Sequence, residues 1–365
     1  MRKLHIHCGL HKTGTTALQN ALHRNAQTLR SQGILFPAAG IPPGLSGHHN
    51  IAWQIARDRR FQPAFGDLKA LFREIGKFDG DVVLSSEDFE SSLRYPERWA
   101  SLKKLANLSG FDTVFIVYFR DPVAYLESLY IENLKHGFGE EYLAVAQRVH
   151  DFGRLNLKEW EFSFDYGQIA AALALQPDAK VIFRDYQMLL GGSVIPDFAA
   201  AIGADPKTLG PAAGSWQANK RASPGAALGQ FARNRGQYRR APFGETQRIA
   251  EYMCQGEQAR LATPARLRDF LESRFLPYRH LVTEVGAHTA PPGLSLPGQV
   301  RGRPENDAGA ATIDMKKFFS FETHMLIQKL TGLIESRGGF PATAKLDDDL
   351  ECKINEWRSW IKGKS

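Results

Sequence analysis

The stretch GLHKTGTT, residues 9–16, contains the residue types that hold a phosphate-like anion. In the common nucleotide loop G-x-x-x-x-G-K-[ST], lysine follows the second glycine and a hydroxyl residue comes next. Here both glycines keep that spacing and Thr16 keeps the last hydroxyl, but Thr15 occupies the lysine position. The lysine, Lys12, lies two residues before the second glycine instead. The pattern therefore predicts an anion site whose cation is displaced.

Backbone and side-chain donors would both serve this site. Amide N–H groups and the helix dipole favour an anion at a helix N-terminus, and the two glycines let the backbone approach it closely. The hydroxyls add donors and the lysine adds a point charge. An ordinary turn between a strand and a helix is the plainer interpretation, and the lysine and hydroxyls weigh against it. The residues expected to bind the anion are Lys12, Thr13, Gly14, Thr15 and Thr16.

Two kinds of anionic group fit such a loop. A nucleoside triphosphate normally needs Mg²⁺, held by the loop hydroxyl and an acidic residue at the end of another strand, with lysine on the outer phosphates. A phosphosulfate carries less charge at its transferred group and needs no metal, so hydroxyls and one lysine suffice. The acids that end DVVLSSED (81–88) keep the kinase interpretation open, and the displaced lysine disfavours it.

A second candidate anion-binding group lies in VFIVYFRDPVAYLESLY, residues 114–130. Arg120 follows a dense apolar run that is typical of a buried strand, and ligands bind at the carboxyl ends of parallel strands. Its planar guanidinium can donate two parallel hydrogen bonds to a phosphate. Ser128 lies eight positions later, in a predicted helix. The structural alternatives are a capping ion pair of Arg120 with Asp121 or Glu127, and a serine that bonds back to a helix carbonyl.

Together these segments resemble a known family. GLHKTGTTALQNAL looks like the 5′-phosphosulfate loop of sulfotransferases that use 3′-phosphoadenosine 5′-phosphosulfate (PAPS), particularly the bacterial relatives of glycan sulfotransferases. The family's 3′-phosphate motif is a strand ending in Arg with Ser about eight residues later, which matches Arg120 and Ser128. More loosely, residues 164–189 resemble its later helix-strand unit, and residues 218–228 resemble its N-x-S-L-S-P segment, with arginine replacing the first serine. The resemblance covers residues 3–285 in outline.

The resemblance implies a sulfotransferase. It would move a sulfuryl group from PAPS to a hydroxyl, or an amine, of a carbohydrate or small-molecule acceptor by in-line displacement, with no metal required. Lys12 would bind the oxygen bridging to the sulfuryl group and neutralise the departing phosphate, while Arg120 and Ser128 would bind the 3′-phosphate. The alternatives are a P-loop-type ATP-dependent kinase and, from another class, a basic protein that binds polyanions such as nucleic acid or heparin-like polymers.

An acceptor hydroxyl also needs a general base nearby. The stretch SGHHNIAW (46–53) places His48 and His49 after the first helix, where the family often has its base, and imidazole titrates near neutral pH. Glu87 in LSSEDFE follows a strand end, where a carboxylate can do the same work. Paired histidines in loops are often plain surface residues, and a glutamate at this point often caps a helix. The candidates His49, Glu87 and His48 therefore stay open.

Strand-like and helical segments alternate along the chain. Dense apolar runs are typical of buried parallel strands, and apolar residues at helical spacing predict helices between them. The expected strands are 4–8, 81–86, 113–119 and 179–184, and the expected helices are 15–33 and 120–137. This order predicts an α/β fold, a P-loop-like parallel β-sheet flanked by helices on both faces, with a C-terminal helical extension.

The composition is that of an ordinary globular protein. The 365 residues are 43% hydrophobic and 23% charged, with a net charge of +7 and a pI near 9.2 that favour anionic partners. Three cysteines far apart argue against a disulfide framework and for a reducing compartment. No Cys/His spacing predicts a metal site. No apolar run approaches the ~20 residues needed to span a bilayer, and no signal peptide precedes the loop, so we expect a cytoplasmic protein.

The expected organisation has three parts. Residues 1–285 form a sulfotransferase-like α/β domain, 286–311 a Pro/Gly-rich linker or loop, and 312–365 a helical C-terminal extension. The extension is an appended unit, a dimerisation arm or more core, and a homodimer through its helices is one expected assembly. Four arginines in residues 232–240 form either a solvated helix face or a rim for an anionic acceptor or cofactor. We expect a small-molecule or glycan acceptor as the partner, and neither nucleic acid nor a membrane.

Overall fold

A computed structural model of the chain describes most of the first 210 residues and a few residues beyond them. The described residues are 2–140, 142–157, 160–175, 179–189, 193–210, 234, 268–269 and 271–272. They fall into two compact units. The first contains residues 2–125, 148–210 and 271–272 within those limits, and the second contains 126–147, 234 and 268–269. The predicted linker and C-terminal extension lie outside the described residues, as do the four arginines of 232–240.

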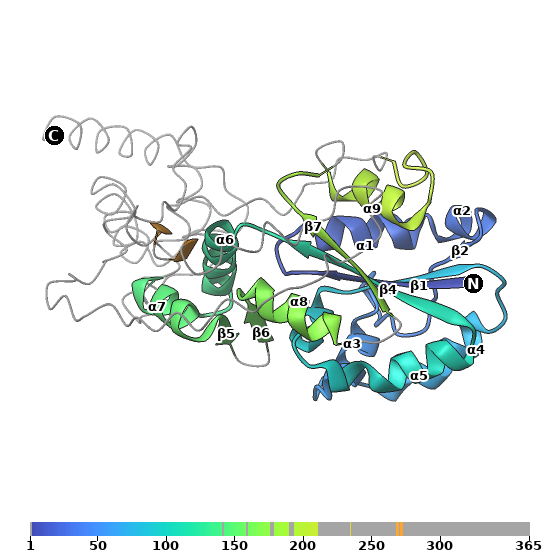
Figure 1. Ribbon diagram of the computed structural model, residues 1–365, viewed down its shortest axis with the longest axis horizontal. Coiled ribbons are helices and arrows are strands. Elements are labelled where there is room, and N and C mark those ends of the chain that lie inside the picture. Colours follow the sequence, from blue (N-terminus) through green and yellow to red (C-terminus); the bar gives the residue numbers. More distant parts are fainter. Residues whose placement is uncertain are drawn as a thin grey trace, which may run out of the picture. The chain divides into compact units, whose positions relative to one another are not determined.

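A five-stranded parallel sheet forms the centre of the first unit (Figure 1). Its strands are β1 (Arg2–Gly9), β2 (Ile34–Leu35), β3 (Asp81–Ser85), β4 (Phe111–Phe119) and β7 (Ala179–Asp185). They lie in the order β2-β3-β1-β4-β7, and every neighbouring pair is parallel. The four expected strands are confirmed, each to within two residues at its ends.

Helices cover both faces of this sheet, which keeps its apolar strands away from water. The described residues contain the helices α1 (Thr15–Arg24), α2 (Ala26–Ser31), α3 (His49–Ala56), α4 (Leu68–Ile75), α5 (Ala100–Leu108), α6 (Pro122–Lys135), α7 (Tyr142–Phe152), α8 (Tyr166–Ala174) and α9 (Val194–Ile202), with short 3₁₀ helices η1 (Pro63–Phe65), η2 (Glu87–Ser92) and η3 (Pro96–Trp99). Figure 1 shows α1, α2 and α9 on one face, with α4 and α5 on the other. An antiparallel hairpin joins β5 (Arg154–Leu157) to β6 (Trp160–Ser163). The prediction of an α/β fold is confirmed at this level.

The single helix expected at 15–33 is wrong, because Asn25 divides it into α1 and α2. Asn25 bonds to the carbonyl of Ala21 twice, from its backbone N–H at 3.1 Å and from its side-chain Nδ2 at 2.8 Å. Asparagine favours such local bonds over continuing a helix. Gly33, two residues after the end of α2, has φ 80°, a left-handed conformation that glycine adopts readily.

The helix expected at 120–137 is present as α6, and residues that favour a helix start and a helix end lie at its two ends. Asp121 Oδ1 accepts a hydrogen bond from the backbone N–H of Ala124 at 2.8 Å, and Pro122 is the first helical residue. Gly137, two residues after the last, has φ 86°. The helix begins in the first unit and continues into the second.

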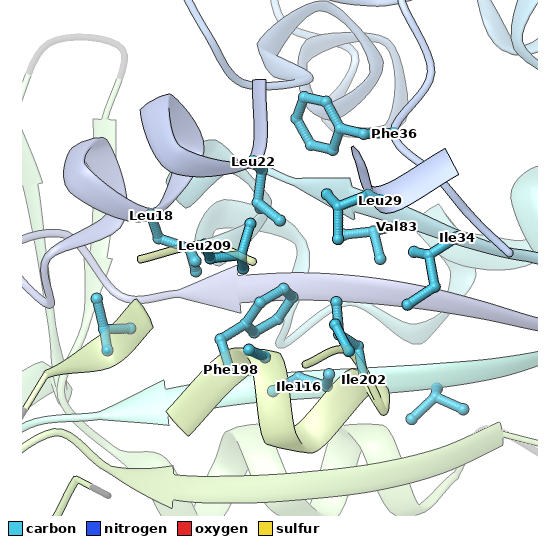
Figure 2. Close-up of a cluster of buried hydrophobic side chains, with 14 of the residues drawn as sticks. Leu18, Leu22, Leu29, Ile34, Phe36, Val83, Ile116, Phe198, Ile202 and Leu209 are labelled. Atoms are coloured by element: carbon cyan, nitrogen blue, oxygen red, sulfur yellow. The ribbon is translucent and has the colours of Figure 1, made fainter. Parts of the chain in front are cut away.

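A cluster of buried apolar side chains holds α1, α2 and α9 against the sheet (Figure 2). Leu18 and Leu22 from α1 and Phe198 from α9 are all fully buried in it, together with Val83 and Ile116 from the strands. Burying one such side chain contributes roughly 1.5–3 kcal/mol. The cluster therefore fixes the first turns of α1 on the sheet, and with them the end of the loop that precedes α1.

The strand order reverses direction at β1. From β1 the chain forms β2 and β3 on one side, and then β4 and β7 on the other. In such sheets, ligands bind outside the carboxyl ends of the strands at the point of reversal. Gly9 at the end of β1 is in register with Tyr118 of β4, so the segments that follow these two strands begin side by side.

Candidate functional site

The loop after β1, Leu10–Gly14, has an unusual backbone. Lys12 has φ 66° and Gly14 has φ 77°, both in the left-handed region. For a lysine this conformation costs roughly 1–3 kcal/mol, and such residues concentrate at functional sites. Gly9 is needed for a different reason, since a Cβ at this position would lie 2.6 Å from Thr15 Cγ2. The two glycines of the predicted motif thus have separate steric roles.

The start of α1 has backbone N–H groups that no side chain caps. Gly14 is its N-cap and no side chain caps the helix, so the first helical hydrogen bond is from Leu18 N to Gly14 O at 3.1 Å. The amides of Thr15 and Thr16 precede that bond, and such amides together with the helix dipole favour an anionic ligand. The side chain of Thr16 is exposed here and that of Thr15 is buried.

Thr13 contributes to the loop in a way the sequence did not indicate. Its side chain is fully buried, and its Oγ1 donates a 2.6 Å hydrogen bond to the carbonyl of Leu10. Because that hydrogen is used inside the loop, the hydroxyl of Thr13 holds the turn together. We therefore expect Thr13 to contribute to ligand binding through its main chain and not through its hydroxyl.

Arg120 brings the two predicted motifs together. Directly after β4, its Nη1 donates a 2.7 Å hydrogen bond to the main-chain carbonyl of Lys12. Its own carbonyl accepts a bond from Tyr166 Oη at 2.8 Å, and its guanidinium carbon lies 5.7 Å from the centre of the Tyr186 ring. Asp121, the residue of the capping alternative, caps α6. The hydrogen bond to the Lys12 carbonyl therefore holds the guanidinium beside the loop that is predicted to bind an anion.

Ser128 lies on α6, eight positions after Arg120. Its side chain is 8% exposed and it belongs to the second unit, where its neighbour Glu127 pairs with Arg268 at 3.5 Å. The loop and Arg120 belong to the first unit. The proposed contact of Ser128 with a phosphate stays a prediction.

His48, one of the three candidate bases, is bound by the main chain on both sides of its ring. Its Nε2 lies 2.9 Å from the carbonyl of Pro37, and its Nδ1 accepts a 3.1 Å hydrogen bond from the backbone N–H of Ser85. The ring is fully buried, and this burial lowers the pKa of His48 to about 3. His48 has no nitrogen left for an acceptor and joins α3 to β3 instead.

His49 differs from His48, because its ring bonds to side chains and, among the described residues, through one nitrogen only. Its Nδ1 lies 2.9 Å from Asp88 Oδ2 and 3.0 Å from Ser86 Oγ, and Trp53 Nε1 donates to the same Asp88 oxygen at 2.9 Å. Within the described part of the chain, Nε2 has no hydrogen-bond partner. Burial lowers the pKa of His49, but the hydrogen bond that its ring donates to Asp88 and nearby carboxylate charges outweigh it, so the pKa is raised.

Glu87, the third candidate, is half-buried at the start of η2. Gln19 of α1 donates a hydrogen bond from Nε2 to Glu87 Oε2. Glu87 therefore lies beside the helix that follows the anion loop. The three candidates separate clearly: His48 is structural, while His49 and Glu87 lie among polar groups that link η2 to α1 and α3.

Two further residues of this region were missed in the sequence. Glu90 of η2 is fully buried, and His11 of the loop contacts it through both its backbone N–H, at 3.0 Å, and its ring Nδ1, at 2.8 Å. The one sequence signal for His11 is its position beside Lys12 in a predicted anion loop. No local pattern distinguished Glu90 from the two acids before it.

The described residues contain no group of three or more His, Cys, Asp or Glu side chains placed to hold a metal ion. Nor does any helix among them combine the length and hydropathy that a membrane crossing requires.

No family model matches the chain, and no curated protein matches it. Among solved structures, it is similar to a chain from the PezAT chromosomal toxin-antitoxin system of Streptococcus pneumoniae, with 10% identity and a TM-score of 0.28. The match covers 50% of this chain and 69% of that one. A likeness at this level carries no argument about function.

Proposed function

We propose that this protein is a PAPS-dependent sulfotransferase. The observation that carries the proposal is the 2.7 Å hydrogen bond from Arg120 Nη1 to the carbonyl of Lys12. PAPS has one anionic group at its 5′ end and another at its 3′ position, so it needs two cationic groups within its own span. The left-handed backbone of Lys12 and the uncapped start of α1 support a loop that binds an anion over a plain turn.

In the proposed reaction, an acceptor oxygen attacks sulfur in line with the bond to the departing 5′-phosphate. A new O–S bond forms while the old S–O bond breaks, its electron pair leaves with the phosphate, and the acceptor proton passes to a base. Lys12 and the loop amides stabilise the charge that grows on the leaving oxygen. Arg120 and, by resemblance, Ser128 bind the 3′-phosphate. The acceptor is a carbohydrate or small molecule with a hydroxyl or amine.

His49 is the base of this proposal. The carboxylate of Asp88 holds Nδ1 and can only accept, so Nδ1 carries the hydrogen of the neutral ring and Nε2 takes the acceptor proton. Asp88 is then a positioning residue. Glu87 is the second candidate. It directly precedes Asp88 on η2, and its carboxylate can accept a proton directly.

The alternative function is a kinase on the same fold, and the acidic residues after β3 are the ones that would distinguish it. A P-loop kinase uses an acidic residue at the end of a neighbouring strand to hold Mg²⁺. Here Glu87, Asp88 and Glu90 are each hydrogen-bonded to a side chain, an amide for the first and an imidazole for the other two. These engagements, with the displaced lysine, favour a donor that needs no metal. The polyanion alternative depends on arginines outside the described residues.

Calorimetry on the full-length protein tests the proposal. In metal-free buffer we expect adenosine 3′,5′-bisphosphate to bind, and Lys12→Ala or Arg120→Ala to weaken it about 10- to 100-fold, since each removes a charge-assisted contact with phosphate. Lys12→Ala should also lower PAPS turnover by ~10²–10³-fold, the usual effect of losing one preorganised donor.

Lys69→Ala provides the matched control, because Lys69 is an exposed lysine of α4 on which the proposal places no role. It should bind the bisphosphate as the parent does. Binding of Mg²⁺-ATP without any binding of the bisphosphate would overturn the proposal in favour of a kinase. Turnover of Lys12→Ala within threefold of the parent would remove Lys12 from its role.

A further inference from the structure

Glu90 is a buried carboxylate on which several segments of the first unit converge. Its side chain is 0% exposed. Tyr125 Oη donates to it at 2.9 Å, the backbone N–H of Ser163 at 2.6 Å, and His11 through its backbone N–H at 3.0 Å and ring Nδ1 at 2.8 Å. His11 thus makes two of these bonds. The carboxylate fixes both the path of the loop and the orientation of the ring.

The ring of His11 is held on one side and open on the other. Because the Glu90 oxygen can only accept from it, Nδ1 carries a hydrogen. Phe162 packs edge-on against the ring, with centroids 4.9 Å apart and planes at 87°. Nε2 has no hydrogen-bond partner within the described ranges, and the side chain is 20% exposed. The open nitrogen therefore belongs to the residue directly before Lys12.

We propose that His11 is a catalytic residue whose imidazolium, oriented by Glu90, donates a hydrogen bond from Nε2 to the transferable sulfuryl group and supplies the second positive charge of the loop. This inference rests on the proposed sulfotransferase function. In the common loop, the lysine after the second glycine contacts the outermost group of the ligand. Thr15 occupies that position here. Lys12 and His11 together supply what the missing lysine would, and Glu90 is a positioning residue that acts through His11.

The surroundings of His11 favour its charged form. Burial lowers the pKa of His11, but the hydrogen bond and charge of Glu90, with the charges of nearby acids, outweigh it and raise the pKa above its ordinary value. A group that works as a cation loses its effect as the pH rises through its pKa, so PAPS binding should weaken on the alkaline side. The titratable groups around His11 are Glu87, Asp88 and Glu90 from η2, His49 from α3, Tyr125 from α6 and Lys12 in its own loop.

The test compares two nucleotides in calorimetry between about pH 6 and pH 9. His11→Asn keeps a side-chain N–H that can donate to Glu90 but has no group at the position of Nε2. We expect it to weaken PAPS binding about 10- to 100-fold at the acidic end, the usual effect of a charge-assisted hydrogen bond. Adenosine 3′,5′-bisphosphate lacks the sulfuryl group, so its affinity should change less than threefold. The variant should also lose the pH dependence of PAPS binding.

Two further variants complete the test. His23→Asn makes the same change at an exposed residue of α1 and should match the parent. His11→Gln places a neutral amide near the Nε2 position and should bind PAPS without the alkaline loss, which covers the case in which the asparagine variant does not fold. If a folded His11 variant binds PAPS as the parent does, with the same pH dependence, the inference is wrong and the proposed function stands. If the parent binds neither nucleotide, the proposed function fails as well.

Discussion

Glu90 and Asp197 are two carboxylates of the first unit with closely similar surroundings. Both are 0% exposed, and each accepts hydrogen bonds from a tyrosine and from a basic side chain. Asp197 of α9 accepts from Tyr118 Oη at 2.7 Å and from Arg184 through Nε at 3.0 Å and through Nη2. We name Tyr118, Arg184 and Asp197 the Asp197 cluster, and His11, Glu90, Tyr125 and Ser163 the Glu90 cluster.

The two clusters differ in what their basic member can still do. In the Asp197 cluster, Arg184 is 5% exposed and directs two nitrogens at one carboxylate, while Tyr118 is part of the apolar core. In the Glu90 cluster, the outer nitrogen of His11 has no partner in the described part of the chain. A buried charge alone therefore does not indicate chemistry. We assign a chemical role only where a buried charge orients an open donor at the carboxyl edge of the parallel sheet.

The largest effect is expected in the Asp197 cluster. Asp197→Ala removes the carboxylate that accepts two hydrogen bonds from the buried guanidinium of Arg184, which should lower the free energy of unfolding by about 3–5 kcal/mol in urea denaturation. Folded Asp197→Ala should still bind adenosine 3′,5′-bisphosphate as the parent does. The exposed Asp205, which accepts a hydrogen bond from Lys207 N, gives the control, and Asp205→Ala should lose less than about 1 kcal/mol. An equally small loss in Asp197→Ala would contradict a structural role for this cluster.

An effect of intermediate size distinguishes the imidazole of His49 from that of His11. His49 accepts a proton only when neutral, so turnover should fall as the pH drops through its raised pKa. His49→Ala should lower turnover about 10²-fold and remove this acidic limb of the pH–rate profile. Glu87→Gln should keep the limb, and its loss there alone would make Glu87 the base. PAPS binding, which our inference makes dependent on the cationic form of His11, should instead weaken on the opposite, alkaline side.

The smallest effect comes from a matched pair of hydroxyl deletions. Tyr118→Phe and Tyr125→Phe each remove one donor from a buried carboxylate, and each should cost about 1–2 kcal/mol in the free energy of unfolding. Tyr125→Phe should also shift PAPS binding. With one donor fewer, Glu90 attracts the proton of His11 more strongly, the pKa of His11 rises, and binding persists to higher pH. A shift in Tyr118→Phe, or none in Tyr125→Phe, would contradict the division between the clusters.

Most of the sheet was predictable because its strands are covered on both faces. Such strands need apolar side chains throughout, and the runs at 81–86 and 113–119 predicted β3 and β4 for that reason. The two-residue β2 and the four-residue strands of the β5–β6 hairpin are too short for a periodic signal. The break at Asn25 depends on a single side-chain hydrogen bond, which no apolar pattern records.

The candidate site was predictable only where its signals are local. Spacing within the loop and a basic residue at a strand end both lie in short stretches, so the sequence alone could propose Lys12 and Arg120. Glu90 was missed because its donors come from residues far apart in the chain. His48 and His49 are adjacent, yet one bonds to the main chain and the other to Asp88. A sequence pattern contains no information on which way neighbouring rings point.

The left-handed backbone of Lys12 affects how this protein would respond to engineering. Glycine adopts φ 66° with little strain, so Lys12→Gly would relieve roughly 1–3 kcal/mol, offset in part by the greater chain entropy of glycine. Selection for heat tolerance would therefore tend to enrich this substitution. If Lys12 has its proposed role, the enriched variants would be inactive, and a library at this loop has to be sorted by turnover as well as by melting temperature.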